Sequence, residues 1–432
     1  MSPRPQVLVI GTTADYIDDL RQRVPGRLLF LTDPAERDRF TGPAPAGHEE
    51  ILCPLEDSDL VTTAVRRFVE RHGVEIAGIT CYDCESLALT ARIAGALGLP
   101  FHSPAAIGRA RSKFHAKLRW QEAGLTAPRV KLMRNITDVL EFWRAAGRDI
   151  VLKPLAGSGS EFVFRCRDEQ ACLQAIRTMQ ERIPVHPNRR MYALERLPDH
   201  VSPVDTFCAE TYVGGAEYSC DAVISNGELR VVRLTRKLPL DDEEFGTTMA
   251  YQILNDYPRY LPERELRVVL KNAARSLGLY HAWFMADFKL FRNRIWLLEV
   301  TPRPGGDCLP ALVSAAGGPD IRLAVLDFAA GQRVSLPQLG EYRPLVGLQC
   351  FASREGRLSQ LEMPEDFVRS KLVQVCLNKR PGDVVRLPPE DYDSRKLGTI
   401  IFEPVARIPV EAQCREIRKA LKVEMEETAH AT

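Results

Sequence analysis

The chain has 432 residues, of which 45% are apolar and 27% are charged; this is a globular composition, and the length indicates about three domains. The formal net charge is +1 and no apolar run approaches the roughly 18 residues of a membrane span, which argues against nucleic acid and membranes as partners. The eleven cysteines are scattered, and the N-terminus enters a strand pattern without a signal peptide, so we expect reduced thiols and a cytoplasmic protein.

Residues 1–110 alternate short apolar strands with helical patterns. Alternation of this kind predicts a parallel sheet, as in a Rossmann-like domain. Only one glycine, Gly11, follows the first strand, so the GxGxxG fingerprint of dinucleotide binding is absent and an NAD-dependent oxidoreductase is disfavoured. The expected strands are residues 6–13, 27–33, 49–53 and 74–81.

Residues 111–333 form a second predicted domain, and residues 334–432 form a small α/β cap. Gly124 and Pro128 end a helix near the start of the second domain, and from residue 150 the pattern is rich in strands. Asn226–Gly227 stands between two alternating runs. The pair predicts a tight hairpin, because Asn-Gly readily adopts the positive φ angles that such turns require.

A lysine and a glycine loop follow the first strand of this β-rich region. Lys153 lies near the end of an apolar strand and precedes Gly157, Ser158, Gly159 and Ser160. Small residues let backbone N–H groups approach an anion closely, and the ammonium group supplies charge. The loop leads into another strand at residues 161–164 and not into a helix, so it is not a Walker A loop. We expect a hairpin flap that folds over an anionic ligand; the alternative is a plain turn.

Two acids lie on strands that are expected to pair. If residues 292–294 form a three-residue loop, counting outward places Asp287 directly opposite Glu299. Opposed side chains share a sheet face with Cβ atoms about 5 Å apart, so the two charges would repel unless a hard cation such as Mg²⁺ lay between them. Thr301 points to the same side and would add a hydroxyl or position a water. A two-residue loop would instead put the acids on opposite faces, as solvated residues.

Taken together, four motifs resemble the ATP-grasp superfamily and, within it, the carboxylate–amine ligases that act on L-amino acids or peptides. The resemblance implies an α/β ATP-grasp fold: a Rossmann-like (pre-ATP-grasp) domain at 1–110, split nucleotide-binding lobes at 111–333, and a C-terminal α/β cap at 334–432. The four motifs are SKFHAKLRWQEAGLTAPR (112–129), VLKPLAGSGS (151–160), AETYVGGAEYSCDAV (209–223), and ADF with LLEVTPRPGG (286–288 and 297–306).

The resemblance implies a site for ATP. Lys113 would reach the nucleotide phosphates together with Lys153, beneath a flap that contains Gly157, Ser158, Gly159 and Ser160. Glu210 would line the adenine pocket through its side chain. Tyr212 and Val213 would do so largely through their backbone, and Glu217 would accept the ribose hydroxyls.

The resemblance also implies a metal site. Asp287, Glu299 and Thr301 would hold Mg²⁺ or Mn²⁺. Arg303 would act with Lys153 in catalysis, because the rigid Pro-Arg-Pro break aims a bidentate donor at the transferring phosphoryl group or a substrate carboxylate. The chain departs from the family at three places. Thr301 replaces a frequent asparagine, Ser112 an aspartate, and Asp287 the commoner glutamate.

The implied reaction joins a small-molecule carboxylate to an amine, with an amino acid as one of them. The carboxylate attacks the γ-phosphoryl group of ATP to give an acyl phosphate and ADP, and the amine then displaces phosphate. Such chemistry asks the protein chiefly for positioning and charge neutralisation. The alternatives are a carboxylate kinase, a formyl-type transferase, or a nucleotide-binding module with little turnover. A homodimer is common among similar proteins.

Overall fold

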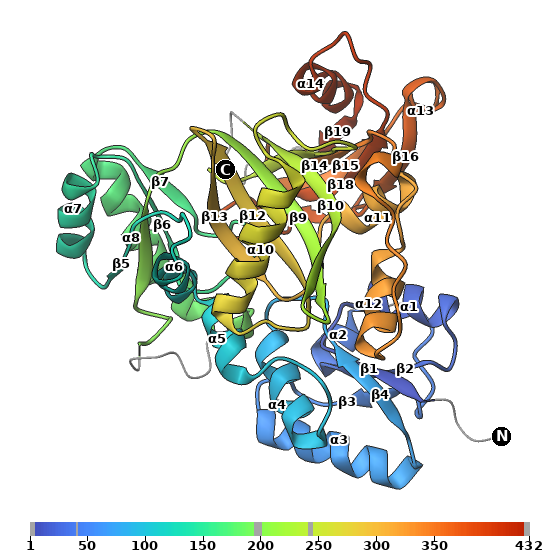
Figure 1. The fold of residues 1–432 in the computed structure, drawn as a ribbon. Helices are drawn as coiled ribbons and strands as arrows, with labels where there is room; N and C mark the ends of the chain where they lie inside the picture. The colour runs from blue at the N-terminus through green and yellow to red at the C-terminus, as the bar shows by residue number, and fades with distance from the viewer. Residues whose placement is uncertain (1–4, 40–41, 194–200, 241–244, 427–432) are drawn as a thin grey trace, which may run out of the picture.

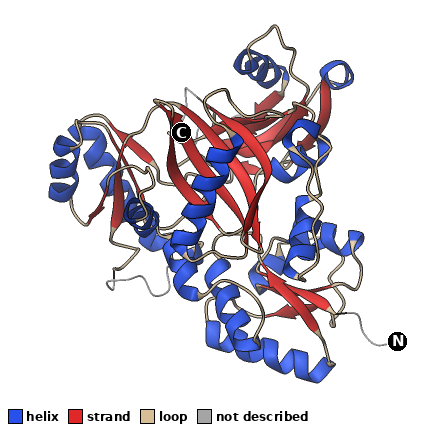
Figure 2. Ribbon diagram, viewed as in Figure 1, coloured by secondary structure: helices blue, strands red, loops and turns tan. Residues whose placement is uncertain are grey.

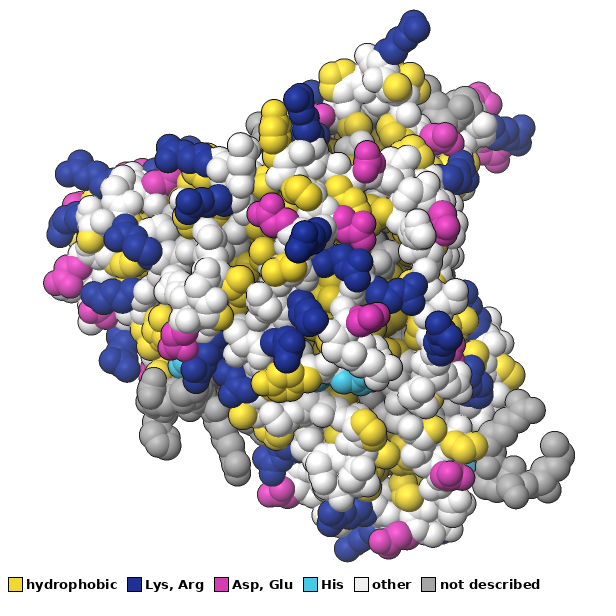
Figure 3. All heavy atoms as spheres, viewed as in Figure 1, with side chains coloured by type: hydrophobic (Ala, Val, Ile, Leu, Met, Phe, Trp, Pro, Cys, Tyr) yellow, Lys and Arg dark blue, Asp and Glu magenta, His cyan; other side chains and the backbone are white. Residues whose placement is uncertain are grey.

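The computed structural model describes residues 5–39, 42–193, 201–240 and 245–426 (Figure 1). These residues form four sheets with helices packed against them (Figure 2). None of the helices they form is long and apolar enough to cross a membrane. On the face drawn in Figure 3, lysine and arginine side chains are interspersed with aspartate and glutamate, in keeping with the net charge of +1.

The N-terminal sheet is parallel and has the order β3-β2-β1-β4, so the predicted parallel sheet is confirmed. Side chains of β1 alternate between two cores: Leu8 and Ile10 pack on the side of α3, and Val7 and Val9 on the side of α1 and α12. Its elements are β1 (Gln6–Ile10), α1 (Ala14–Arg23), β2 (Leu28–Thr32), α2 (Pro34–Asp38), β3 (Glu50–Leu52), α3 (Ser58–His72), β4 (Ile76–Thr80) and α4 (Leu87–Leu97); α12 is Ile321–Ala329.

Two linker helices lead to a central lobe built on an antiparallel sheet of order β5-β8-β6-β7. The helices α5 and α6 both begin at a serine whose hydroxyl accepts a backbone N–H: Ser103 from Ala106 and Ser112 from His115. Ser112 therefore works as a helix cap. The elements are α5 (Pro104–Arg111), α6 (Lys113–Glu122), β5 (Val130–Met133), α7 (Ile136–Ala145), β6 (Ile150–Pro154), β7 (Phe164–Cys166), α8 (Glu169–Arg182), η1 (Ile183–Val185), α9 (Arg189–Tyr192) and β8 (Phe207–Thr211).

The largest sheet has eight strands in the order β13-β12-β9-β10-β11-β14-β18-β16. The last three strands lie beyond residue 333, so the expected cap shares this sheet with the preceding region. The turn at Asn226–Gly227 has φ angles of 51° and 76°, which confirms the predicted hairpin. The strands are β9 (Ala216–Ser225), β10 (Glu228–Pro239), β11 (Thr248–Ile253), β12 (Ala282–Phe291), β13 (Arg294–Thr301), β14 (Val346–Phe351), β16 (Leu372–Leu377) and β18 (Lys396–Phe402).

The remaining elements cover the large sheet or complete the cap. The cap's own three-stranded sheet has the order β17-β15-β19. The elements are α10 (Glu263–Leu277), α11 (Leu309–Ala315), η3 (Leu339–Glu341), β15 (Gly356–Glu362), α13 (Glu365–Lys371), β17 (Val384–Val385), α14 (Val410–Ala420) and β19 (Lys422–Met425).

The large sheet has one apolar face and one polar face where β9, β10 and β12 run side by side. The apolar face packs on α10 (Figure 1). Phe284 and Phe288 of the sheet lie in one core with Leu266 and Leu270 of the helix. Because successive side chains of a strand point to opposite faces, the residues between them face the other way. The charged and hydroxyl-bearing residues on this polar face are Glu217, Ser219, Asp221, Arg233, Thr235, Lys237, Asp287 and Lys289.

Candidate active site

The β12–β13 hairpin places Asp287 directly opposite Glu299, as predicted, but by a different route. The expected three-residue loop at 292–294 is wrong: the turn has two residues, Arg292–Asn293, with φ angles of 50° and 56°. Such a type I′ turn matches the twist of the strands. On its own it would put the acids on opposite faces. A β-bulge at Leu298 adds one residue to β13 and restores the pair to one face.

The oxygens of the two acids fit a hard divalent cation. Oδ2 of Asp287 accepts a hydrogen bond from Lys237 Nζ at 2.9 Å, whereas its buried Oδ1 has no hydrogen-bond partner among the described residues. Oε1 of Glu299 accepts from the Thr301 hydroxyl at 3.2 Å. No group of three His, Cys, Asp or Glu side chains suited to a metal occurs in the described parts. A cation here would take its other ligands from phosphate or water, as Mg²⁺ commonly does.

Three lysines lie close to Glu299. Burial alone would raise the pKa of Glu299, but the ammonium groups of Lys113, Lys153 and Lys117 hold it below its ordinary value. Lys113 Nζ donates to the backbone oxygen of Gly157 at 3.1 Å, so the linker lysine lies against the flap. The structure therefore brings together the acid, the linker lysine, the strand lysine and the glycine loop, as the sequence predicts.

Glu210 connects two of these lysines. Its Oε1 lies 2.6 Å from Lys153 Nζ and 2.6 Å from Lys117 Nζ, and only 3% of its side chain is exposed. Burial raises the pKa of Glu210, but the two ammonium groups pull it below its ordinary value, so the carboxylate is charged. Its contact with adenine stays a prediction. Lys117, fully buried, was missed by the sequence reasoning.

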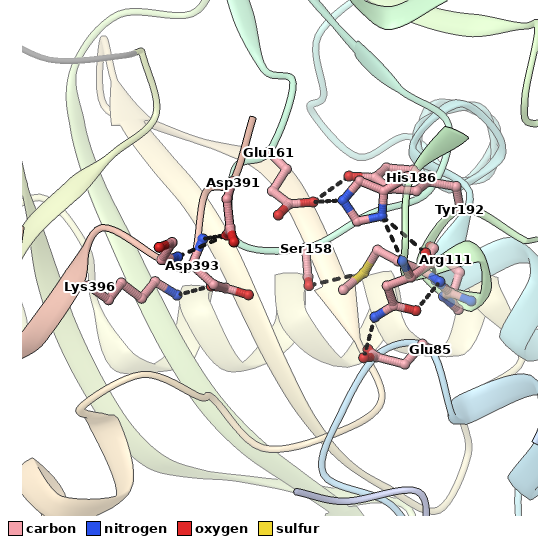
Figure 4. Close-up of polar contacts among 12 residues, drawn as sticks. Glu85, Arg111, Ser158, Glu161, His186, Tyr192, Asp391, Asp393 and Lys396 are labelled. Carbon is pink, nitrogen blue, oxygen red and sulfur yellow. Dashed lines mark hydrogen bonds and ion pairs between the residues drawn. The ribbon is translucent and has the colours of Figure 1, made fainter. Parts of the chain in front are cut away.

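The glycine loop is a hairpin flap, as expected, because β6 and β7 pair antiparallel on either side of it. Gly157 and Gly159 have positive φ angles of 141° and 64°, which glycine adopts without strain, and Ser160 follows with a φ of 62°. The Ser158 hydroxyl contacts Met191 Sδ at 3.3 Å (Figure 4). A loop of small residues of this kind allows backbone N–H groups to approach an anion, and its binding of phosphate stays a prediction.

Aromatic and polar contacts hold the flap to the central lobe and the cap. Phe162, at a φ of 53°, is buried with its ring centroid 5.2 Å from that of Tyr392 in the cap and 6.0 Å from that of Tyr192. The Tyr192 hydroxyl donates to Glu161, and His186 Nε2 lies 3.6 Å from the same carboxylate (Figure 4). The flap is therefore held, just before β7, by the segment at residues 186–192 and by the cap.

Tyr212, Val213 and Glu217, which are predicted to contact the nucleoside of ATP, meet two lysines of the large sheet. Lys289 Nζ donates to the backbone oxygen of Val213 at 3.0 Å and lies 4.9 Å from the ring centroid of Tyr212. Lys237 Nζ forms an ion pair with Glu217 Oε1 at 2.6 Å, and the same ammonium group forms another with Asp287 Oδ2 at 2.9 Å. Burial raises the pKa of Glu217, but Lys237 and Lys289 hold it below its ordinary value. Lys237 thus links the predicted ribose acid to the predicted metal acid.

Arg303 reaches the N-terminal domain. Its Nε donates to Cys84 Sγ at 3.0 Å, and its Nη1 donates to the backbone oxygen of Pro304 at 2.7 Å. Two residues later the Gly305 N–H donates to Asp221 Oδ1 at 2.9 Å. Arg303 therefore lies where three segments meet: the end of β13, the loop after β4, and the polar face of the sheet. Its action on a phosphoryl group stays a prediction.

A buried ion pair lies beneath this turn. Arg233 Nε donates to Asp221 Oδ2 at 2.9 Å, and both side chains are 0% exposed. The guanidinium also reaches the Ser219 backbone oxygen at 3.0 Å and the Thr235 hydroxyl at 2.9 Å. A Cβ on Gly305 would lie 2.4 Å from Arg233 Nη2, so only glycine fits here. Arg233 thus joins β9 and β10 beneath the turn that carries Arg303.

The loop after β4 contributes acids and contacts from the N-terminal domain. The Ser86 N–H donates to Asp83 Oδ1 at 2.6 Å, and the Ser86 hydroxyl accepts from Arg190 Nη2 at 2.6 Å. Asn188 Nδ2 donates to Glu85 at 3.0 Å (Figure 4). The loop is thereby joined to the segment at residues 186–192, which also contacts the flap through Tyr192 and Glu161.

Asp83 is expected to make stability depend on pH. Burial and the neighbouring Glu85 raise the pKa of Asp83 to about 7. The unfolded chain releases this proton at a lower pH than the folded chain, so the contribution of Asp83 to stability falls as pH rises from about 4 to about 7. Asp83→Asn carries no such proton. Its thermal midpoint relative to the parent should therefore be higher at pH 7.5 than at pH 4.5.

The control for that experiment is Glu122→Gln, which removes an exposed acid on α6. Its midpoint should follow that of the parent protein at both pH values. Parallel pH profiles for Asp83→Asn and the parent would contradict the raised pKa.

Comparison with known proteins agrees with this geometry. A family model for the ATP-grasp domain matches residues 146–311, which include the flap, Glu210, Glu217 and both opposed acids. The chain contains an ATP-grasp domain. The crystal structure of an L-amino acid ligase from Bacillus licheniformis matches 99% of this chain and 100% of its own, with a TM-score of 0.74 and 20% identity. The two proteins share the ATP-grasp fold.

Two curated relatives match part of the chain. Carnosine synthase 1 of Homo sapiens is 26% identical over 302 residues, which are 66% of this chain and 35% of the synthase. The chain therefore spans about a third of the length of that relative. A D-alanine–D-alanine ligase of Neisseria gonorrhoeae (strain NCCP11945) is 22% identical over 242 residues, which are 54% of this chain and 73% of the ligase.

Proposed function

We propose that this protein is an ATP-dependent carboxylate–amine ligase, which forms an amide or peptide bond through an acyl phosphate and releases ADP and phosphate. The observation that carries the proposal is the meeting of Asp287 and Glu299 on one sheet face, with Lys113 and Lys153 close to Glu299 and a glycine flap above. The relatives whose names are amino-acid ligases or synthases support an amino acid as one substrate.

Each group has a distinct task in this proposal. Lys113 and Lys153 would neutralise the phosphates of ATP, and Arg303 would orient the substrate carboxylate or stabilise charge on the transferring phosphoryl group. Asp287 and Glu299 would hold Mg²⁺ or Mn²⁺, which when bound supplies further positive charge to the phosphates. The flap would exclude water, because a mixed anhydride that meets water is lost by hydrolysis.

We also propose a cellular compartment, the class of partners and an oligomeric state for the enzyme. All eleven cysteines are free thiols and ten of them are buried, which supports a reducing compartment such as the cytoplasm. The partners would be small molecules, and a homodimer is the expected assembly, which light scattering on the purified protein checks.

An ADP-release screen with amino acids, singly and in pairs, tests the proposal. We expect ADP to form when a carboxylate and an amine are both present, with phosphate released in equal amount. ADP release with no amine would instead indicate a carboxylate kinase, and release with formate as the carboxylate would indicate a formyl-type transferase. Tight ATP binding without ADP across a broad panel would indicate a nucleotide-binding module. Any of these outcomes overturns the ligase.

A further inference from the structure

The register of the two acids depends on the bulge in β13. The two-residue turn pairs Phe291 with Arg294, and this register alone would bring Leu298 opposite Asp287. Glu299 takes that position only because Leu298 is the extra residue between the pair at Leu297 and the pair at Glu299. Whatever holds the bulge therefore decides whether both carboxylates face one side.

Strand β13 lies at the edge of the sheet, where the linker covers it. The Leu297 N–H donates to the backbone oxygen of Thr126 at 3.0 Å, so the chain after α6 lies against the outer edge of β13. The bulge interrupts the pairing of β13 with β12, and the backbone groups of its extra residue have no partner in the hydrogen-bond ladder. Such a carbonyl, where it is withdrawn from water, destabilises the fold unless a donor reaches it; that of Leu298 is partly buried.

Lys117 is that donor. Its Nζ lies 2.7 Å from the backbone oxygen of Leu298, 2.6 Å from Glu210 Oε1, and 3.4 Å from the backbone oxygen of Lys113. The side chain is 0% exposed. A buried ammonium group is unfavourable without a counter-charge, and Glu210 supplies one. The three contacts join the linker helix, the central lobe and the bulge at a single atom.

The same contacts leave Lys153, which is predicted to bind the phosphates of ATP, free to exchange Glu210 for a ligand. Glu210 Oε1 is shared between Lys117 and Lys153. If Lys153 turns toward phosphates, Lys117 remains to neutralise Glu210, so the carboxylate does not become an unpaired buried charge. Lys117 itself is not expected to bind phosphate, because its hydrogen bond to the Leu298 oxygen holds it against β13.

We propose that Lys117 is a positioning residue, which holds the Leu298 bulge and so keeps Asp287 and Glu299 on the same face for a cation at the nucleotide. The inference rests on the proposed function only in assigning the cation to bound ATP. Nothing in the sequence motifs assigns this lysine a role; it lies four residues after Lys113, on the same side of α6.

The first test is Lys117→Met. The dissociation constant of ATP is measured calorimetrically with saturating Mg²⁺ and again in EDTA, and the ratio of the two gives the enhancement by the metal. Supporting groups of this kind change metal affinity by about tenfold or more, so we expect the enhancement to fall by about that factor. Lys131→Met, an exposed lysine on β5, is the control and should leave the ratio unchanged. An unchanged ratio in Lys117→Met would overturn the inference.

A rescue separates positioning from a general loss of structure. Deletion of Leu298 removes the bulge and leaves every other pair of the hairpin as it is, with Asp287 still opposite Glu299. The deletion in the Lys117→Met background should therefore restore the enhancement to within about threefold of the parent ratio, well inside the tenfold loss. If the lysine acted only through its charge, the deletion would not restore it.

Hydrogen exchange of the ligand-free protein keeps the inference testable without nucleotide. In Lys117→Met the amides of β13 near Leu298 should exchange faster than in the parent, while those of β1 should not change. Equal protection of β13 in both proteins would refute the role of Lys117. Failure of the parent to bind ATP would refute the proposed function and leave this exchange result to stand by itself.

Discussion

Glu299→Gln is expected to lower ADP formation by at least about 10³-fold while the protein stays folded. Glutamine keeps the shape of the side chain but not the charge that Lys113 and Lys153 stabilise. Asp287 would then face a neutral amide and not a second carboxylate, so a divalent cation would bind weakly. Charge stabilisation by a bound metal is worth several kcal/mol in the transition state, and each 1.4 kcal/mol corresponds to about tenfold in rate.

ADP release under the best substrate pair from the screen measures the effect, and thermal unfolding shows that the fold survives. Glu228→Gln is the matched control, since it makes the same change at an exposed position where β10 begins. It should retain the parent rate. Turnover near the parent level in Glu299→Gln would remove Glu299 from the mechanism.

The arrangement of the strands could be predicted from sequence where local pattern decides it. Strands alternating with helices predict the parallel N-terminal sheet, and Asn226–Gly227 predicts a hairpin because its backbone needs are local. The cap is different. Its strands extend the large sheet through the pairing of β11 with β14, which joins segments about 100 residues apart, and no local pattern shows such a contact.

The pairing of Asp287 with Glu299 was predicted correctly because two features absent from the prediction, a shorter turn and a β-bulge, offset each other. Arg292–Asn293 has no glycine, so the sequence gives little sign of a type I′ turn, and a bulge at Leu298 leaves no mark in the alternation of apolar residues. Each error alone would have put the acids on opposite faces. They cancel because a two-residue turn with a bulge and a three-residue loop without one give the same pairing.

The supporting residues were harder to find than the predicted ligands. Lys117 follows Lys113 by one helical turn, and Arg233 lies on the same face of β10 as Lys237. The spacing in the sequence therefore places each of them on the same side as a residue of the site. What the pattern does not give is the partner. Arg233 binds Asp221 inside the sheet, whereas Lys237 binds Glu217 and Asp287 at the site, and only the folded structure separates a buried pair from a site residue.

Arg233→Met is expected to lower the free energy of unfolding by about 3–5 kcal/mol, because it leaves Asp221 buried without its counter-charge. Burial already raises the pKa of Asp221 against the pull of Arg233 and the Gly305 N–H. Without the guanidinium its folded pKa would rise further, while the unfolded chain still ionises at the ordinary value. The loss should therefore be smaller at pH 5 than at pH 8. Chemical denaturation at the two pH values measures it.

Arg236→Met is the matched control on the same strand, because Arg236 pairs with Glu411 at a half-exposed site and such pairs contribute about 0–1 kcal/mol. The double change Arg233→Met with Asp221→Leu removes both charges, and similar replacements of buried pairs are close to neutral, so most of the stability should return. Its ADP release should stay low, because the Gly305 N–H has lost its acceptor and Arg303 lies two residues away. A double variant that regained both stability and turnover would show that the pair serves only the fold; one that regained stability alone would show that it also aims the arginine.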